Sequence, residues 1–266
     1  MNIFQQLEHS KAPAAVRLVM IIDYIAKHDE ASFTEICTDL SIPKSSVHHL
    51  LEVLVVTQLL RQRADGRYVL GLRLFELGGL VIKNIDLRKD TINFMHELVK
   101  ETELTCHLGI MDGDNGFFLS KVESPKAIVK TSWEGKKIVF NRMSLGKVLV
   151  AWLPQERIES LIADCTFEYL TPRTITNKED FLQHLKIVKE QGWAIDDGED
   201  IEEICCMAAP IFNQNGEVIA AIGVNGMQSQ YANGKKEKHL ASLIKTSKAI
   251  TAHINSRNID LSLIHI

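Results

Sequence analysis

Features that would mark a membrane protein, a disulfide-stabilised protein or a zinc protein are scarce in this sequence. The 266 residues include five cysteines, an odd number. None of them stands in a Cys-x-x-Cys spacing, so neither a disulfide framework nor a structural zinc site is expected. No apolar run approaches the roughly 20 residues that cross a bilayer, and the first residues lack the charged and then apolar segments of a signal peptide. We therefore expect a cytoplasmic protein that does not associate with membranes.

Motifs of catalysis and cofactor binding are missing as well. Glycine-rich phosphate loops of the P-loop or Rossmann type are absent. The acidic run over residues 196–203 offers paired carboxylates, but no nucleophile or metal motif accompanies it. Cys205 and Cys206 are neighbours in a predicted strand and point to opposite faces, which disfavours chelation of one ion. His107, in another apolar strand, is expected to be a hydrogen-bonded core residue. The sequence predicts no catalytic residue, no metal and no cofactor, and therefore no enzyme.

Strong positive charge is also absent, since the formal net charge is −4. This value argues against a protein that binds polyanions in general. Residues 43–73, however, hold five basic and two acidic residues, a local charge of +3. Binding to DNA requires such a local positive surface, not a basic protein as a whole. The weak charge predicts modest affinity per subunit, which association of several subunits would raise.

The segment Ser41–Leu54 has the pattern of a helix that is buried on one side. Pro43 suits the first turn of a helix, where its missing N–H costs nothing. Apolar residues then recur at i, i+3, i+4 and i+7, namely Val47, Leu50, Leu51 and Leu54. The opposite face is polar and carries Ser45, His48, His49 and Glu52, flanked by Lys44 and Ser46. Helices are also expected over residues 14–27 and, with Thr34 as N-cap, over residues 35–40. This order is that of a helix-turn-helix, whose last helix docks in the major groove.

A basic hairpin is predicted directly after these helices. The dipeptide Asp65-Gly66 stands between two short alternating runs, which is a strong hairpin signal. Its arginines suit a wing that grips phosphates or enters the minor groove. The predicted DNA contacts are therefore Lys44, Ser45, Ser46, His48, His49, Arg61, Arg63 and Arg67. Two alternatives are a hairpin that only caps a core and a winged helix that binds a protein, although this surface lacks the aromatic anchors of a protein hot spot.

The rest of the chain predicts an α+β domain with a largely antiparallel sheet. A helix over residues 72–83 passes Gly78-Gly79, where we place a bend or joint between domains. The expected domains are residues 1–75, a linker helix at 76–85, a second domain at 86–254 and a tail at 255–266. Strands are expected at residues 105–111, 117–122, 127–133, 138–141, 193–197, 206–212 and 218–226. Helices are expected from residue 86, at 145–153, at 155–164, from a Thr176/Glu179 capping box to Gln191, and at 235–253.

Three groups of motifs resemble the isocitrate-lyase-regulator (IclR) family of bacterial transcription regulators. The N-terminal group is Ile42–Leu51 followed by Gly66–Gly71, and the second is Leu145–Leu149. The third group holds Gly192, Asp196, Glu199, Cys206–Ala208 and Ile211–Asn213 at the spacing of the family's signature. Within the family, regulators of the KdgR type look similar in the segments Leu74–Gly78, His107–Gly109 and Gly146–Trp152.

The resemblance implies a winged helix-turn-helix joined by a helix to a GAF/PAS-like effector domain. It also implies an operator of double-stranded DNA, a small carboxylate effector such as a sugar acid or keto acid, a role as a repressor, and a homodimer or homotetramer. The implied ligand-binding residues are Ser144, Leu145, Gly146, Asp196, Cys206, Gly223 and Asn225. Backbone N–H groups at Ser144-Leu145 suit a carboxylate, and Asp196 and Asn225 suit hydroxyls.

Some residues depart from the pattern of the family. Glu203 replaces a glycine, and Gly223 and Asn225 replace serines that are commoner at these positions. Arg142, just before Met143-Ser144, is either a carboxylate clamp or a surface arginine. These departures affect which ligand is expected, not whether a pocket is expected.

Overall fold

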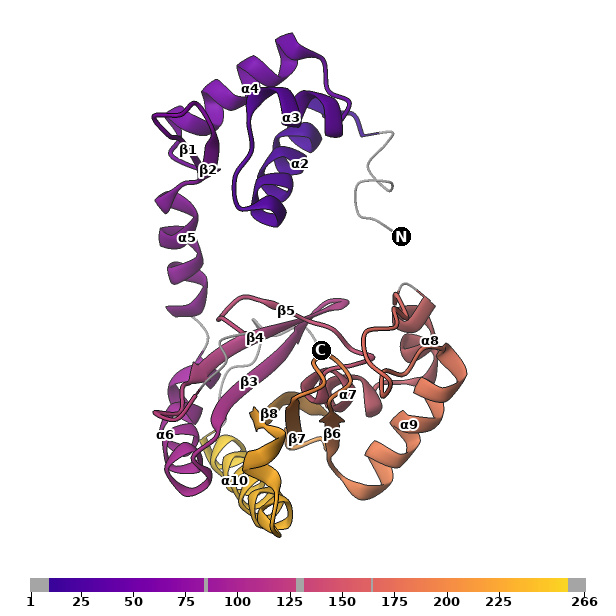
Figure 1. The fold of residues 1–266 in the computed structure, drawn as a ribbon. Helices are drawn as coiled ribbons and strands as arrows, with labels where there is room; N and C mark the ends of the chain where they lie inside the picture. The colour runs from indigo at the N-terminus through magenta and orange to yellow at the C-terminus, as the bar shows by residue number, and fades with distance from the viewer. Residues whose placement is uncertain (1–9, 84–85, 128–131, 164, 258–266) are drawn as a thin grey trace. The chain divides into compact units, whose positions relative to one another are not determined.

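The computed structural model describes residues 10–83, 86–127, 132–163 and 165–257 (Figure 1). The chain divides after Lys83 into two compact units. We call them the first unit (residues 1–83) and the second unit (residues 84–266). In the ranges that the structure describes, we find no helix with the length and apolar character needed to traverse a bilayer.

The first unit is a three-helix bundle followed by a hairpin and a further helix. Its elements are α2 (Pro13–His28), α3 (Phe33–Asp39), α4 (Lys44–Val56), β1 (Leu60–Gln62), β2 (Tyr68–Leu70) and α5 (Leu72–Lys83). The periodic apolar residues predicted for α4 form its core with those of α2 and α3: Val47, Leu51 and Leu54 are at most 2% exposed and pack against Ile21, Ile25 and Ile36. α5 runs through Gly78-Gly79 without a break, so the structure does not place the predicted bend there.

The start of α3 differs from the prediction. The N-cap is Ser32, whose hydroxyl accepts from Glu35 N–H while the Glu35 carboxylate accepts from Ser32 N–H. Thr34 lies inside the first turn, so its assignment as N-cap was wrong. Both residues are good caps. Ser32 takes the position because Glu35 stands three residues later and completes a capping box.

The second unit is built on one antiparallel sheet of six strands in the order β5-β4-β3-β8-β7-β6. The strands are β3 (Thr105–Asp112), β4 (Asn115–Val122), β5 (Lys137–Ile138), β6 (Ala194–Asp197), β7 (Ile204–Phe212) and β8 (Val218–Met227). The helices are α6 (Asp86–Thr102), α7 (Ser144–Ala151), α8 (Gln155–Ala163), α9 (Lys178–Gln191) and α10 (Lys235–Arg257), with the short 3-10 helix η1 (Gln228–Tyr231). The predicted α+β class is confirmed.

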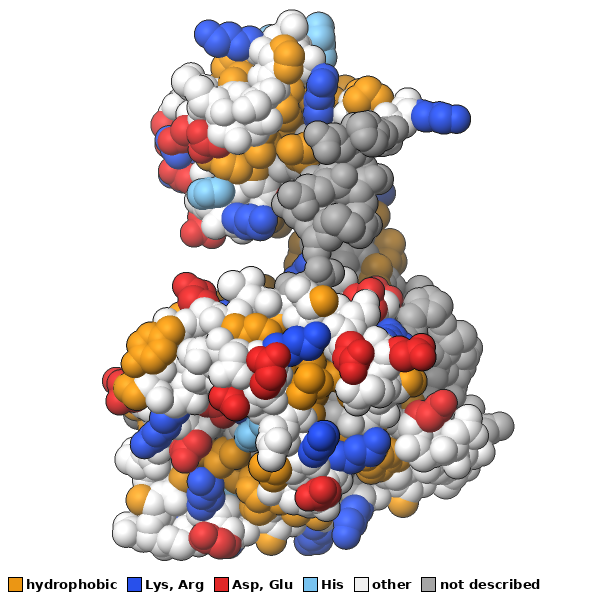
Figure 2. Space-filling view, turned by 90° about the vertical axis from the view of Figure 1, so that its right-hand side faces the viewer, with side chains coloured by type: hydrophobic (Ala, Val, Ile, Leu, Met, Phe, Trp, Pro, Cys, Tyr) orange, Lys and Arg blue, Asp and Glu red, His pale blue; other side chains and the backbone are white. Residues whose placement is uncertain are grey.

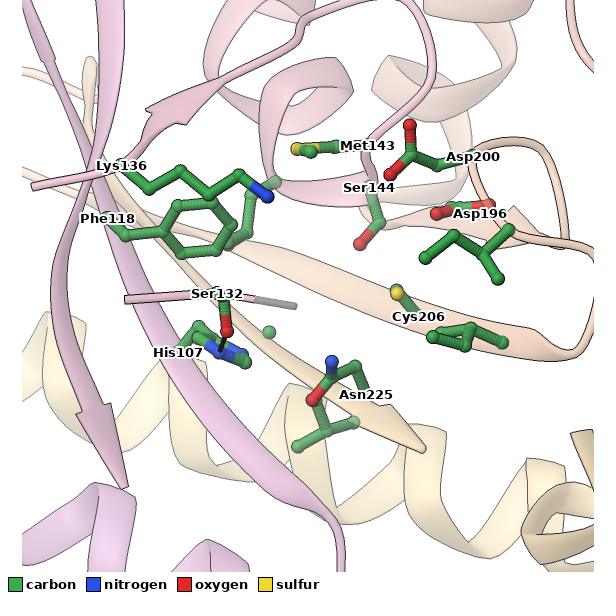
Figure 3. Close-up of a pocket in the computed structure, with 15 residues that line it drawn as sticks. His107, Phe118, Ser132, Lys136, Met143, Ser144, Asp196, Asp200, Cys206 and Asn225 are labelled. Atoms are coloured by element: carbon green, nitrogen blue, oxygen red, sulfur yellow. Dashed lines mark hydrogen bonds between the residues drawn. The ribbon is translucent and has the colours of Figure 1, made fainter. Parts of the chain in front are cut away.

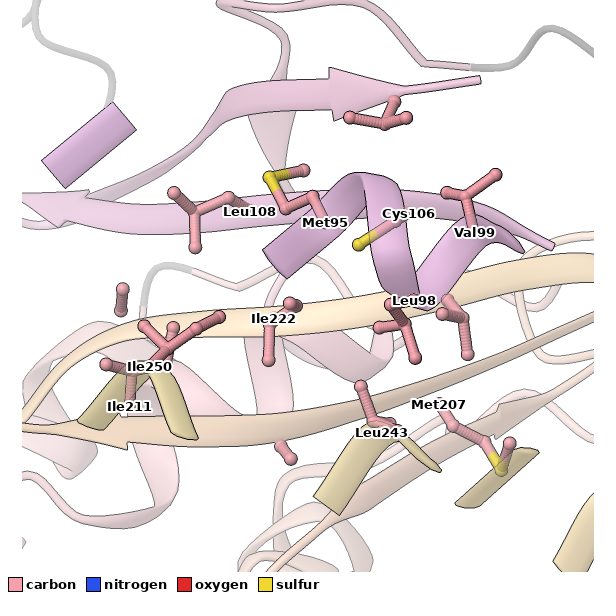
Figure 4. Close-up of a cluster of buried hydrophobic side chains, with 14 of the residues drawn as sticks. Met95, Leu98, Val99, Cys106, Leu108, Met207, Ile211, Ile222, Leu243 and Ile250 are labelled. Atoms are coloured by element: carbon pink, nitrogen blue, oxygen red, sulfur yellow. The ribbon is translucent and has the colours of Figure 1, made fainter. Parts of the chain in front are cut away.

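Helices cover both faces of this sheet (Figure 1). Met207 and Ile222 belong to the apolar cluster that α6 and α10 close, shown in Figure 4. Their neighbours Ala208 and Ala221 belong to the cluster under α7, α8 and α9. Successive residues of a strand point to opposite faces, and a strand covered on both faces is apolar throughout. Residues of β7 and β8 that share the face of Ala208 and Ala221 therefore look toward α7.

Several predicted boundaries in the second unit differ from the structure. The strand predicted at 138–141 is shorter in the structure, where β5 ends at Ile138. The chain turns after this residue and enters α7, and the Val139 carbonyl accepts a hydrogen bond from Met143 N–H in the turn. Most of the predicted strand at 127–133 lies outside the described residues. The Thr176/Glu179 capping box was wrong: Asn177 caps α9 through a 2.9 Å bond from Asp180 N–H to its Oδ1. Gly192 ends α9 with φ +83°, as predicted.

Candidate functional sites

The polar face predicted on α4 is exposed at the start of that helix. Lys44, Ser45, His48 and His49 are exposed, and Ser46 is half-buried. Pro43 is the N-cap of α4 and offers no side-chain hydrogen bond, so no cap side chain pairs with the first N–H groups of the helix. Free N–H groups at a helix start bind phosphate. The surface view in Figure 2 shows basic, acidic and apolar side chains interspersed on the visible face, without a continuous basic patch.

Two of the three arginines of the hairpin form ion pairs with acidic side chains of the first unit. Arg63 pairs with Glu30, and Arg67 pairs with Glu30 at 2.7 Å and with Glu35 at 3.0 Å. The pKa of Glu35 is held below its usual value, first by its hydrogen bonds with Ser32 and then by Arg67. Arg61 is exposed and has no ion pair within the described part of the chain. The sequence did not predict that Glu30 and Glu35 face the hairpin and partly neutralise it.

A possible metal-ligand set is also present on α4. One ligand atom each of His48, His49 and Glu52 lies within 4.8 Å of the other two. All three side chains are exposed, and His49 Nδ1 lies 4.0 Å from Glu52 Oε2. Nothing else in the structure points to an ion here, so we assign the three residues no metal.

A pocket in the second unit unites most of the predicted ligand-binding residues. It encloses about 560 Å³, including the space at its open mouth. Ser144 and Leu145 contribute from the start of α7, Asp196 from β6, Cys206 from β7, and Gly223 and Asn225 from β8. Figure 3 shows Ser144, Asp196, Asp200 and Cys206 on one side of the pocket, with His107, Phe118, Ser132 and Lys136 on the other.

Gly146, Arg142 and Glu203 do not belong to this lining. A Cβ on Gly146 would lie 2.6 Å from the Phe140 Cα and 2.7 Å from the Val139 carbonyl oxygen, so this glycine serves close packing. Arg142 pairs with Asp200 at 2.6 Å, which makes it neither a free clamp nor a free surface arginine. Glu203 is exposed.

The sequence missed the wall of the pocket that β3, β4 and the following loop supply. His107, Phe118, Ser132 and Lys136 lie on it. The sequence also missed Met143 and Asp200, which lie on the opposite side (Figure 3). His107 pairs with Gly223 in the register of β3 with β8, and Thr105 pairs with Asn225. The missing information was the order of the strands, because β3 and β8 are far apart in the sequence and adjacent in the sheet.

His107 supplies a neutral hydrogen-bonding group to this wall. Burial, followed by the nearby Lys121 and Lys136, lowers its pKa to about 3. Its Nε2 lies 2.6 Å from the Ser132 hydroxyl, and its ring meets the Phe118 ring edge to face. The prediction of a buried, hydrogen-bonded residue is confirmed, and the same side chain lines the pocket.

The opposite wall holds a carboxyl group and a protonated thiol. Burial raises the pKa of Asp196 to about 6. Asp196 pairs with Cys206 across β6 and β7. Burial, then Asp196, raises the pKa of the Cys206 thiol well above its usual value, so this sulfur is not a thiolate nucleophile. Between the walls, the buried Asn225 Oδ1 has no hydrogen-bond partner in the described part of the chain.

Comparison with known proteins identifies both units. The family described as "Bacterial transcriptional regulator IclR C-terminal" matches residues 79–252, and "IclR helix-turn-helix domain" matches residues 14–64. The chain is 38% identical to the "Uncharacterized HTH-type transcriptional regulator RhmR" of Escherichia coli K12 over 224 residues, which cover 84% of this chain and 86% of that protein. It is 28% identical to the regulator KdgR of the same organism, covering 92% of this chain and 95% of that protein.

A solved structure shows the same fold. The IclR homologue of Microbacterium hydrocarbonoxydans complexed with 4-hydroxybenzoate aligns with a TM-score of 0.75 at 20% identity, covering 91% of this chain and 99% of that chain. The predicted class of an N-terminal helix-turn-helix and an α+β domain is thereby confirmed, and a GAF-like domain is consistent with it. The chain is a DNA-binding transcriptional regulator of the IclR family and not an enzyme.

Proposed function

We propose that this regulator is a repressor of a catabolic operon, and that a small hydroxylated carboxylate bound in the second unit changes its affinity for DNA. The observation that carries the proposal is the unpaired Asn225 Oδ1 inside a pocket lined by polar groups from three strands and a helix start. An unpaired buried acceptor costs free energy unless a ligand donor satisfies it. A ligand hydroxyl supplies such a donor.

The two walls of the pocket complement different parts of such a ligand. The start of α7 at Ser144-Leu145 has no side-chain cap, and Lys136 lines the facing wall, so both favour an anionic group. Asp196 and Asn225 accept hydrogen bonds from hydroxyls, and neutral His107 with Ser132 accepts or donates. A sugar acid or a keto acid carries these groups in one molecule. The ligand of the Microbacterium homologue, 4-hydroxybenzoate, is a hydroxylated carboxylate too, although that similarity concerns the fold alone.

In the first unit, the contact surface for DNA is proposed to be the start of α4 and the hairpin. Lys44, Ser45, Ser46, His48 and His49 would meet base edges and phosphates in the major groove. Arg61 would bind a phosphate directly, whereas Arg63 and Arg67 would share their charge with Glu30 and Glu35. Partly neutralised arginines contribute fewer released counterions on binding.

Association of two or more copies is also part of the proposal. α5 exposes large apolar side chains, with Leu72 at 82% and Phe75 at 81%. Leu80 and Val81 on the same helix are 53% and 63% exposed. Large apolar side chains that are exposed on one helix mark an interaction surface, and the same helix of a second copy would cover part of them. Two copies also let the modest charge of each first unit act together on two half-sites.

Calorimetry on the full chain tests the ligand. The panel contains aldonates, 2-keto-3-deoxy acids and keto acids of two or three carbons. We expect one class to bind, and Asp196→Asn to weaken it at least tenfold, since a hydrogen bond to a charged group contributes about 1.5–3 kcal/mol. Asp197→Asn is the matched control, because Asp197 neighbours Asp196 but does not line the pocket. Binding of amino acids instead would contradict the ligand class, and equal losses in both variants would contradict the site.

A further inference from the structure

A lysine lies in the core of the second unit, behind the wall of the pocket that carries Asp196. The Lys147 side chain on α7 has no exposed surface. Its Nζ donates to the Ile195 carbonyl oxygen at 2.8 Å and pairs with the Glu199 carboxylate. Burial of an ammonium group costs several kcal/mol, so a lysine that only filled space would be a poor choice beside Val148 and Leu149. Its position therefore calls for a role that methionine or leucine cannot fill.

Both groups that Lys147 holds belong to the segment that carries the pocket carboxyl. Ile195 precedes Asp196 in β6, and Glu199 follows it by three residues. The backbone N–H of Glu199 in turn donates to Asp196 Oδ1 at 2.7 Å. Lys147 thus bonds to a residue on each side of Asp196, Ile195 before it and Glu199 after it, and does not line the pocket itself.

The same segment is held from a second direction. The Thr171 hydroxyl donates to the Gly198 carbonyl oxygen at 2.6 Å, and the Thr174 hydroxyl donates to that of Glu199 at 2.7 Å. These bonds fix the backbone after Asp196, but they bring no charge. Lys147 is the partner that adds a cation next to Asp196 and Glu199.

We propose that Lys147 is a positioning residue of the pocket, which fixes the Ile195–Glu199 segment so that Asp196 presents an ionised carboxylate oxygen to a ligand hydroxyl. This role rests on the proposed function, since it assumes that the pocket takes a ligand. Ser144 and Lys147 both lie on α7, so one short helix supplies the anion-binding start of the pocket and the support of its carboxylate.

The charges around Asp196 support this role. Burial raises the pKa of Asp196, which the Glu199 N–H and then Lys147 lower. The Asp200 carboxylate, on the loop after β6, raises this pKa, and the Asp200 N–H lowers it. Cys206 on β7 pairs with Asp196 across the strands and is neutral, because burial raises the pKa of its thiol. Tyr231 on η1 is neutral as well, because burial raises its pKa. His184 on α9 faces Lys147 and is also neutral, since burial and then Lys147 lower its pKa to about 4. Among these groups Lys147 is the cation that lowers the pKa of Asp196 and so favours its ionised form.

The test measures the titration of Asp196 in the full chain without ligand. Carbon-13 NMR of the aspartate carboxyls follows the group, and Asp196→Asn assigns its signal. Three variants are compared: Lys147→Met, Glu199→Gln, and both together. The double variant keeps the fold testable, because it removes both members of the buried Lys147–Glu199 pair together; circular dichroism checks each variant. We expect the titration midpoint of Asp196 in the double variant to exceed that in Glu199→Gln by about one pH unit, a typical effect of a lost neighbouring cation.

An equal midpoint in Glu199→Gln and the double variant would overturn the proposal, because a lysine that only stabilises the fold would not change it. A second measurement uses D-gluconate as the probe in calorimetry. If the wild type binds it, the double variant should bind about tenfold more weakly than Glu199→Gln, as expected for a weakened bond to a charged acceptor. If D-gluconate does not bind the wild type, the proposed ligand class loses support, while the titration still decides the role of Lys147.

Discussion

Gly223 on β8 lies opposite His107 on β3. The Met207 carbonyl oxygen of β7 occupies the space next to Gly223 that a side chain would need. A Cβ at position 223 would lie 2.9 Å from that oxygen and 3.2 Å from Leu145 Cδ2. The first distance is shorter than carbon and oxygen tolerate without a shift of the backbone. The glycine therefore lets β7, β8 and α7 approach each other around the pocket.

Gly223→Ser, which restores the residue that is commoner in the family, should consequently destabilise this protein. Overpacking of a core costs about 1–3 kcal/mol, and the added side chain would also narrow the pocket. Urea unfolding measures the free energy of unfolding. Gly223→Ala is the matched control: an equal loss assigns the effect to Cβ, whereas a loss with serine alone assigns it to the hydroxyl. A variant as stable as the wild type would contradict the close packing described here.

The pH dependence of stability should reveal the buried carboxyl of Asp196. Its pKa is about 6 in the folded protein, against a usual value of 3.8. A folded state that binds the proton more tightly loses stability as the pH rises through this interval. Asp196→Asn keeps an Oδ1 acceptor for the Glu199 N–H but does not titrate. We therefore expect the variant to gain stability relative to the wild type between about pH 4 and pH 7.

The size of this gain should be about 1–3 kcal/mol, given 1.36 kcal/mol per pKa unit and some screening by solvent. Thermal unfolding of both proteins at a series of pH values measures it. The difference between the two proteins removes the effects of His107 and His184, whose lowered pKa values act in the opposite direction. A difference that stays constant with pH would show that Asp196 has an ordinary pKa.

The sequence predicted those parts of the fold and site that depend on local pattern. The apolar period of residues 47–54 predicted α4, and φ +83° at Gly192 confirms the glycine that ends α9. The N-caps of α3 and α9 were missed, because two good capping residues stand close together in each case. Only the hydrogen bonds of the folded helix start show which of the two is the cap. Pocket residues from β3 were missed, since His107 joins Gly223 only through the order of strands. The pairs of Arg63 and Arg67 with Glu30 were missed because more than 30 residues separate them in the sequence.

The apolar surface of α5 leads to a prediction about association. Phe75→Glu should weaken self-association, because each copy would place a charge where the proposed contact buries the phenyl ring. Burial of such a ring stabilises a contact by about 1.5–3 kcal/mol. Sedimentation over a range of concentrations measures the dissociation constant, which should rise at least tenfold. Ile187→Glu on α9 is the control, since Ile187 is 47% exposed in the second unit. A wild type that stays monomeric at every concentration would contradict the proposed homo-oligomer.

The hairpin of the first unit makes the last prediction, a contrast between two arginines. Arg61→Ala should weaken binding to any duplex and reduce the slope of log affinity against log salt by about 0.9, the value for one lost phosphate contact. Arg67→Ala removes the ion pairs of the hairpin with Glu30, which lies between α2 and α3, and with Glu35 of α3. It should therefore destabilise the first unit. It should change the salt slope less, because Arg67 already shares its charge with Glu30 and Glu35 and releases fewer counterions on binding. Fluorescence anisotropy with a duplex selected from a random library, repeated at several salt concentrations, measures both slopes. Thermal unfolding measures the stability of both variants.

Lys27→Ala, a change on α2 outside the predicted contact surface, is the control for loss of one positive charge. If Arg61→Ala leaves affinity and slope unchanged, the hairpin is not a wing that contacts DNA. If Arg67→Ala lowers the slope as much as Arg61→Ala without loss of stability, its ion pairs with Glu30 and Glu35 open when DNA binds, and both arginines contact phosphate.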